Sequence, residues 1–206
     1  MTLDTTQLVA LAAALGWASG LRLYAVVFFT GMVGWLGWVS LPSGLQILQH
    51  PLVLGASGLM LAVEFFADKI PGLDTVWDAV HTFIRIPAGM ALAAGVFGGD
   101  SAAWTTIAAL LGGTLAATSH AAKATTRAAA NTSPEPFSNV GLSLLGDAAV
   151  PTMLWLAFSH PLWFFVALTV ALVLMVTVIV LLFKFLRGLL RAWRARWNPH
   201  VQSPTT

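Results

Sequence analysis

Ionisable residues are rare in this chain, and several of them fall inside long apolar stretches. Charged residues make up 9% of the 206 residues and hydrophobic residues 58%. Arg22 lies in an otherwise uncharged stretch from about 7 to 39, and Glu64 and Asp147 also lie within apolar segments. A charge near the bilayer centre costs at least about 2.5 kcal/mol, so it persists only when it is paired or faces a polar cavity. Arg22 therefore predicts a buried polar centre, with Glu64 and Asp147 as its candidate partners.

A buried pair of this kind has two uses. It can lock helices together, although desolvation offsets much of the attraction and makes this an expensive way to hold a fold. Alternatively, one acid more than Arg22 neutralises leaves a carboxylate that exchanges protons or binds a cation. A proton- or cation-coupled carrier needs that arrangement, and a hydrated cavity produces the same pattern.

Two sets of polar residues are spaced so that each set shares one face of a helix. The first set is Asp74, Asp78, His81 and Arg85. The second set is His120, Lys123, Arg127 and Asn131. Charges at wet helix ends often extend into water without a further role. The alanine-rich flanks of the second set indicate tight packing against protein, which favours an ion-paired vestibule instead.

These patterns predict a site in two parts. The substrate or ion pathway comprises Arg22, Glu64, Asp68, Asp147, His120 and Lys123. The cytoplasmic vestibule comprises Lys69, Asp74, Asp78, His81, Arg85, Arg127, Asn131, Glu135 and Asn139. No catalytic residue, cofactor or metal is predicted.

The elements that must position these residues are membrane helices. The composition predicts an all-α, polytopic membrane protein with about six transmembrane helices. The expected spans are 6–38, 51–67, 74–98, 102–130, 139–158 and 161–186. The first and fourth are longer than one crossing and rich in small residues, so we expect them to be tilted or broken. Residues 1–187 are then one transmembrane domain, followed at 188–206 by a basic interfacial helix and a disordered tail.

Orientation follows from the Lys and Arg residues. With six spans, one set of loops and the tail hold the basic residues, and the other loops, 39–50, 99–101 and 159–160, hold none. The positive-inside rule then predicts a bacterial inner-membrane protein with both termini in the cytoplasm.

Residues 58–64 resemble residues 141–147, because both begin with Gly-Leu and end with an acid. Two halves, about 1–99 and 100–187, would form a 3+3 inverted repeat, which many secondary transporters use. A chance match between apolar helices explains the similarity equally well.

Sequence motifs for enzymes are mostly absent. The chain has no Walker A loop, nucleophile elbow, zinc helix or dinucleotide fingerprint, and it has no cysteine. His81 and His120 are compatible with a metal, but hydrogen-bonded helix residues are the favoured interpretation. The nearby Lys and Arg residues are suited to a phosphate or to anionic lipids.

Two polar runs carry a resemblance to a known family. The first is the run from Glu64 to Pro71, and the second is the Ser-Pro-Glu-Pro-Phe-Ser-Asn run at 133–139. With Gly20-Leu21-Arg22 they resemble the bacterial membrane family catalogued as domain of unknown function 4126. This chain departs from the expected acidic pair near Asp147, where it has Gly146. The resemblance implies a multi-pass membrane fold and no known activity.

The sequence thus favours a small ion- or proton-coupled transporter or channel rather than an enzyme. Its expected partners are the lipid bilayer, anionic lipids and a small solute or ion, and no nucleic acid. Two alternatives stay open. One is a protein that handles phosphorylated lipids, as a flippase or headgroup enzyme, and the other is a non-catalytic membrane scaffold.

Overall fold

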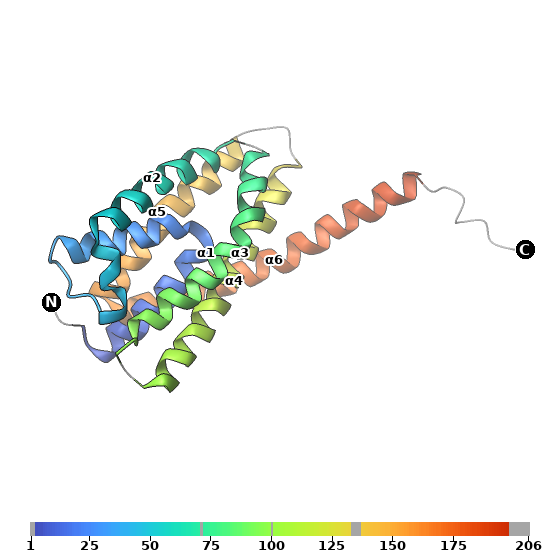
Figure 1. Ribbon diagram of the computed structural model, residues 1–206. Coiled ribbons are helices and arrows are strands. Elements are labelled where there is room, and N and C mark those ends of the chain that lie inside the picture. The colour runs from blue at the N-terminus through green and yellow to red at the C-terminus, as the bar shows by residue number, and fades with distance from the viewer. Residues whose placement is uncertain (1–2, 71, 100, 133–136, 198–206) are drawn as a thin grey trace, which may run out of the picture.

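The computed structural model describes residues 3–70, 72–99, 101–132 and 137–197, and this part of the chain is helical without strands (Figure 1). The elements are α1 (Thr5–Trp35), a short 3₁₀ helix η1 (Ser43–Gln49), α2 (Pro51–Ala67), α3 (Leu73–Val96), α4 (Ala102–Ala130), α5 (Phe137–Ser159) and α6 (Pro161–Trp197). Each of the six expected segments therefore contains one long helix. Glu135 and the tail from 198 to 206 lie outside the described residues.

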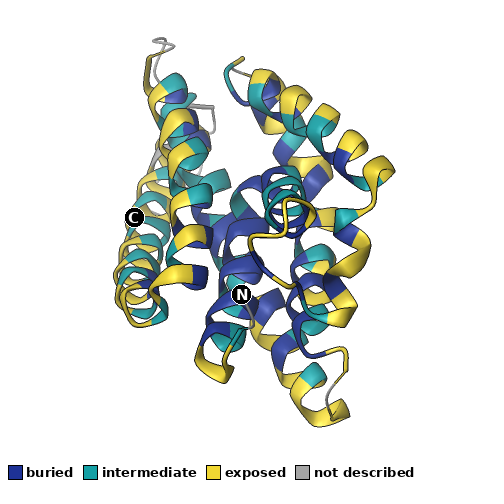
Figure 2. Cartoon of the chain, turned by 90° about the vertical axis from the view of Figure 1, so that its left-hand side faces the viewer, coloured by how far each residue is buried: buried dark blue, intermediate teal, exposed yellow. Residues whose placement is uncertain are grey.

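Four of these helices are long and apolar enough to cross a membrane, namely α1, α3, α5 and α6. The bent pair of η1 and α2 raises the number to five, and six spans are not confirmed. The apolar helices indicate a membrane protein. Helix α1 is central in this protein. In its most apolar 18-residue segment, 78% is buried, whereas in the most apolar 18-residue segment of α6 only 6% is buried. Figure 2 shows the buried residues gathered towards the middle of the bundle.

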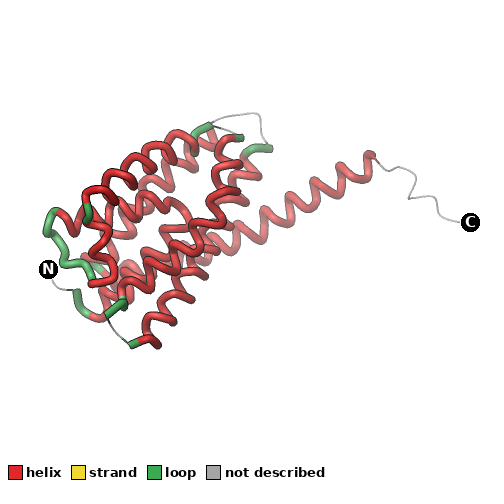
Figure 3. The backbone as a smooth tube through the Cα atoms, viewed as in Figure 1, coloured by secondary structure: helices red, strands yellow, loops and turns green. Residues whose placement is uncertain are grey.

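Helix α1 breaks at Arg22 and folds back on itself. Arg22 has φ −147° and ψ 78°, which interrupts the helix between a first arm, 5–21, and a second arm, 23–35. A straight helix of this length would separate its ends by about 45 Å. Instead, Leu8 in the first arm and Ser43, just beyond the second arm, line one pocket. Figure 3 shows the N-terminus and nearby loops at the same end of the bundle. The long first helix was expected to be tilted or broken, and it is broken.

The fold-back changes the predicted topology. Gln7 at the start of α1 donates a 2.8 Å hydrogen bond to the carbonyl of Phe158 at the end of α5. The N-terminus therefore lies at the end of the bundle where α3 and α5 finish, while the far part of α6 leaves the opposite end (Figure 1). The prediction that both termini lie on one side is not confirmed, because α1 enters and leaves the bundle at the same end, and the described end of α6 lies beyond the opposite end. We call this end the N-terminal end and the opposite one the basic end.

The inverted repeat is not confirmed. In a 3+3 repeat α1 corresponds to α4, yet α4 is continuous over 102–130 where α1 is broken. Packing is also unequal, since α3 lies along α4 whereas the corresponding pair, α6 and α1, barely touches.

Small residues allow the first arm of α1 to lie close to α4. A Cβ on Gly16 would lie 2.5 Å from the Cα of Gly112, so the two backbones touch. A Cβ on Gly112 would in turn collide with Ala93 of α3. This tight three-helix contact fixes the depth at which the α1 break sits.

Helix α6 is continuous past the expected end of the transmembrane domain at 187. Its 37 residues correspond to about 55 Å, well beyond the roughly 30 Å of a bilayer core. The segment with Lys184, Arg187, Arg191 and Arg194 thus extends from the last helix beyond the bundle (Figure 1). Its position at the membrane interface stays a prediction.

Candidate functional site

The break in α1 exposes backbone carbonyls that a continuous helix would satisfy. Side chains of α4 bind two carbonyls at the end of the first arm, including that of Leu21 at the break. The Ser119 hydroxyl donates to the carbonyl of Trp17 at 2.6 Å, and Lys123 Nζ donates to the carbonyl of Leu21 at 3.1 Å. Hydrogen bonds from the neighbouring helix α4 therefore stabilise the break as part of the fold.

Arg22 points from this break towards α2 and α5. Its Nη1 lies 2.9 Å from Asp68 Oδ2, and its Nη2 lies 2.8 Å from Asp147 Oδ1. Nη2 also donates to the Ser143 hydroxyl at 2.8 Å and to the Ser143 carbonyl at 3.1 Å. The guanidinium is buried, so a single arginine holds the end of α2 and the middle of α5 to the tip of α1.

One of the two expected partners of Arg22 is thus confirmed and the other is wrong. Asp147 pairs with Arg22, but Glu64 pairs with Arg85 at 2.6 Å. The reason is the fold-back, which brings the α1 tip level with Asp68, the C-cap residue of α2 and one helical turn beyond Glu64.

Asp68 is the hub of the charged network. Its fully buried carboxylate accepts ion pairs from Arg22, from Lys123 at 2.9 Å and from Arg127 at 3.2 Å. These three cations come from two helices, α1 and α4. A carboxylate with several cationic partners can lose one of them without being left uncompensated.

Arg85 forms the deepest part of the network. It pairs with Glu64 and, at 2.8 Å, with Asp78, and all three side chains are 5% exposed or less. His120 Nδ1 lies 3.3 Å from Arg85 Nη1, and its Nε2 lies 2.7 Å from the Thr82 hydroxyl. Arg85 donates, and the Thr82 hydroxyl donates to the carbonyl of Asp78, so in the neutral ring Nδ1 accepts from Arg85 and Nε2–H donates to Thr82.

The other side of the network is more open. Asp147 pairs with Lys69 at 3.3 Å, and these two side chains are 21% and 20% exposed. Lys69 Nζ also lies 3.0 Å from the centre of the Phe65 ring, a cation–π contact. Near the basic end, Arg127 lies 3.5 Å from Asp74, and Asn131 links Asp74 to Asn139.

The network is electrically balanced. Its five cations are Arg22, Lys69, Arg85, Lys123 and Arg127. Its five acids are Glu64, Asp68, Asp74, Asp78 and Asp147. The cations include every Lys and Arg before residue 184. The surplus acid that a proton- or cation-coupled carrier needs is therefore not found among these pairs, because Lys69, Lys123 and Arg127 also belong to the centre.

His81 lies apart from the ion pairs. It stacks on Trp77, with ring centres 4.1 Å apart, and its Nδ1 lies 2.8 Å from the Trp77 carbonyl. A carbonyl only accepts, so Nδ1 carries the proton and Nε2 accepts from Tyr24 at 3.1 Å in the neutral ring. No group of three or more His, Asp or Glu side chains in the described ranges is arranged to hold a metal ion.

Sequence reasoning missed the hydroxyl partners. Ser143, Ser119 and Tyr24 each bind a member of the centre or the released backbone. One signal was available, since Ser143 precedes Asp147 by four residues and thus shares its helix face. Nothing in the sequence marked Ser119 or Tyr24, because their roles follow from the break in α1.

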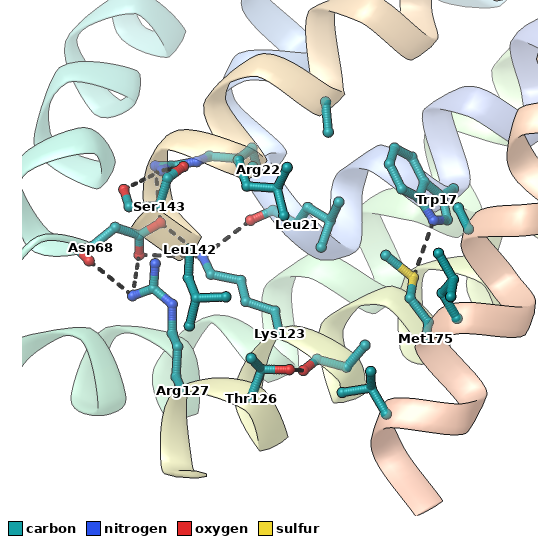
Figure 4. A pocket seen from close by; sticks show the side chains of 17 residues that line it. Trp17, Leu21, Arg22, Asp68, Lys123, Thr126, Arg127, Leu142, Ser143 and Met175 are labelled. Carbon is teal, nitrogen blue, oxygen red and sulfur yellow. Dashed lines mark hydrogen bonds and ion pairs between the residues drawn. The ribbon is translucent and has the colours of Figure 1, made fainter. Parts of the chain in front are cut away.

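A cavity of about 330 Å³ borders the network between α1, α4, α5 and α6 (Figure 4). Arg22, Asp68, Lys123, Arg127 and Ser143 line one side of it. At another side Trp17 Nε1 lies 3.3 Å from Met175 Sδ. The charged centre therefore adjoins a space that a ligand can occupy.

Together, the apolar helices and the buried ion pairs define a class: a helical membrane protein with a polar centre at a broken helix. Within that class, the family model described as a domain of unknown function (DUF4126) matches residues 9–181, and the chain belongs to this family. No curated protein and no solved structure is significantly similar to the chain.

Proposed function

We propose that this protein is a small membrane carrier whose binding site lies at the folded-back tip of α1. The observation that carries the proposal is the break at Arg22, where a buried charge and released carbonyls meet inside the bundle. Non-helical backbone at membrane depth is tolerated where it is buried in protein or lines a cavity, and carriers build their sites from such broken helices.

The charged network is suited to a site where a ligand or proton binds and leaves. Asp68 contacts three cations and Arg22 contacts two acids, so a pair can be exchanged for a ligand or proton without stranding a buried charge. The substrate or ion pathway that we propose runs past Arg22, Asp68, Asp147 and Lys123. Glu64 and His120 belong to the tightly closed part behind it.

The proposed orientation in a bacterial inner membrane follows from the basic residues. Lys69, Arg127 and the α6 extension lie towards the basic end, whereas Ser40, Ser43 and His160 at the N-terminal end have no Lys or Arg beside them. The positive-inside rule therefore puts the basic end in the cytoplasm and the start of α1 on the outer side.

A second candidate is a protein that handles phosphorylated lipids, as a flippase or headgroup enzyme. The mostly apolar lining of the cavity beside Arg22, Lys123 and Arg127 favours it. Both candidates use the same side chains, but a headgroup enzyme needs access only from one face of the membrane.

Single cysteines test the carrier, because the chain has none of its own. Gly146→Cys puts a thiol at the cavity, where a Cβ would lie 3.8 Å from Arg22 Nε, an ordinary contact. We expect a membrane-impermeant thiol reagent to label this position in vesicles from either face. Labelling from the cytoplasmic face alone would overturn the carrier in favour of lipid-headgroup chemistry.

Three exposed positions serve as controls for sidedness. Thr5→Cys and Ser40→Cys should label together from the outer face, since both lie at the N-terminal end. Thr132→Cys should label only from the cytoplasmic face. Labelling of Thr5→Cys and Thr132→Cys from the same face would contradict the folded-back α1.

A further inference from the structure

The cavity between α1, α4, α5 and α6 has the size of a ligand site. Its volume of about 330 Å³ falls within the range of roughly 300–1,000 Å³ that is usual for small-molecule pockets. It is bounded by four different helices, so its shape depends on the folded bundle and not on one loop.

The lining of the cavity has two chemically different parts. Buried charged groups from α1, α2 and α4 form one part (Figure 4). The rest is apolar, with Leu142, Leu145 and Ala149 from α5 and Ala171, Leu174, Met175 and Val178 from α6. A purely polar solute would leave the apolar walls unused, and a hydrocarbon would leave the charges without a partner. The lining suits a molecule with a charged head and an apolar body.

The charged part favours an anionic head. Arg22, Lys123 and Arg127 line the cavity with a single acid, Asp68, and the other acids of the network are not among its lining residues. Arg22 Nη1 is buried and lies 2.9 Å from Asp68 Oδ2, although this ion pair does not have hydrogen-bond geometry. A phosphate or carboxylate oxygen beside Arg22, Lys123 and Arg127 would accept charge-assisted hydrogen bonds from these cations.

The cavity opens on the outer side of the bundle, between α5 and α6. Leu145 of α5 and Leu174 of α6 both line the cavity, yet they are 67% and 59% exposed on the outside of the bundle. The surrounding outer surface of α6 is apolar, including Val170, Val173 and Leu181. A ligand entering between α5 and α6 therefore arrives from the hydrocarbon layer of the membrane.

We propose that this cavity binds a single-chain anionic amphiphile, with its phosphate or carboxylate head at Arg22, Lys123 and Arg127 and its chain between α5 and α6. The inference rests on the proposed function, since it names the substrate class of the same site. A ligand of this kind accounts for three features together: its head contacts the charged lining, its chain contacts the apolar lining, and it enters through the lateral opening.

The test measures binding to the purified full chain in a non-ionic detergent, by native mass spectrometry and calorimetry. Dodecyl phosphate is the probe, inorganic phosphate is the probe for a free anion, and dodecyltrimethylammonium reverses the charge. We expect saturable one-to-one binding of dodecyl phosphate at least tenfold tighter than that of the other two. Equal binding of inorganic phosphate would overturn the inference in favour of a free anion, and equal binding of the cation would overturn the anionic head.

A matched pair of variants locates the site without touching the ion pairs. Ala149→Phe fills the cavity, whereas Ala148→Phe adds the same side chain at an exposed neighbour that does not line it. We expect Ala149→Phe to weaken dodecyl phosphate binding at least tenfold and Ala148→Phe to leave it unchanged. Equal binding by both variants would overturn the assignment to this cavity.

The outcome separates the inference from the proposed function. If Gly146→Cys labels from both faces but dodecyl phosphate does not bind, the amphiphile inference is contradicted and the carrier proposal is supported. If dodecyl phosphate binds at the cavity but labelling is one-sided, the carrier proposal is contradicted and the amphiphile site is supported.

Discussion

The two sides of the ion-pair network differ in how tightly they are closed. Around Arg85, both acids and the arginine are at most 5% exposed, and none of the three lines the cavity beside Arg22. Around Arg22, the partner Asp147 and its second cation Lys69 are about one fifth exposed, and a cavity adjoins the arginine. The two arginines therefore face the same kind of partner but different surroundings. We infer that the ion pairs around Arg85 stabilise the helix bundle and that the ion pairs around Arg22 belong to the ligand site.

Removing Arg85 should have the largest effect on folding. Arg85→Met keeps the volume but leaves Glu64 and Asp78 with fewer cations in a closed interior, and breaking a buried pair costs about 3–5 kcal/mol. We expect little folded protein by size-exclusion chromatography in detergent. Adding Glu64→Gln should recover part of the loss, because it removes the stranded charge. A single variant as stable as the wild type would contradict a structural role for this side.

Removing Arg22 should lower stability less than removing Arg85 does, and it should abolish ligand binding. Arg22→Met leaves Asp68 with Lys123 and Arg127, and it leaves the partly exposed Asp147 with Lys69. The loss of the hydrogen bonds to Ser143 should lower the free energy of unfolding by about 2 kcal/mol. We expect a folded protein by thermal melting that no longer retains dodecyl phosphate. A collapse as severe as that of Arg85→Met would erase the difference between the two sides.

Tyr24 offers a smaller test next to the closed side. Tyr24→Phe removes one hydrogen bond, to His81, and keeps the edge-to-face ring contact. We expect the free energy of unfolding to fall by about 1 kcal/mol, as measured by denaturation in detergent, with unchanged amphiphile binding. Weakened binding would show that the closed side also communicates with the cavity.

The sequence predicted much of this arrangement, for reasons that individual residues make clear. Arg22 was informative because an unpaired charge in an apolar stretch is so costly, and the helical spacing of Asp78 with Arg85 already put them on one face. Helix positions followed from apolar runs that begin at Pro51 and Pro161. These features depend on local spacing and composition alone.

The topology and the pairing of Glu64 could not be predicted in the same way. An apolar run of about thirty residues with a single charge is equally compatible with one tilted span and with two arms joined at a break. The choice depends on Ser119 and Lys123, which bind carbonyls at the end of the first arm of α1 from 102 residues away. Because the fold-back also sets the depth of Arg22, the same missing information decided between Asp68 and Glu64 as its partner.

Asp147 should show the smallest change in stability and the most selective change in function. Asp147→Asn keeps an oxygen that accepts from Arg22 and removes one charge from a pair that is about one fifth exposed, so stability should change by less than about 1 kcal/mol. The cavity side then carries an additional net positive charge, which favours an anionic head. We therefore expect dodecyl phosphate to bind more tightly to Asp147→Asn, by a few fold in calorimetry, while the melting temperature stays close to that of the wild type. The matched change on the closed side, Glu64→Gln, removes a carboxylate whose ion pair is with Arg85, and it should lower the melting temperature without tightening binding. If the two variants behave alike, the network acts as one undivided unit, and the distinction between a side that holds the fold and a side that meets the ligand is lost.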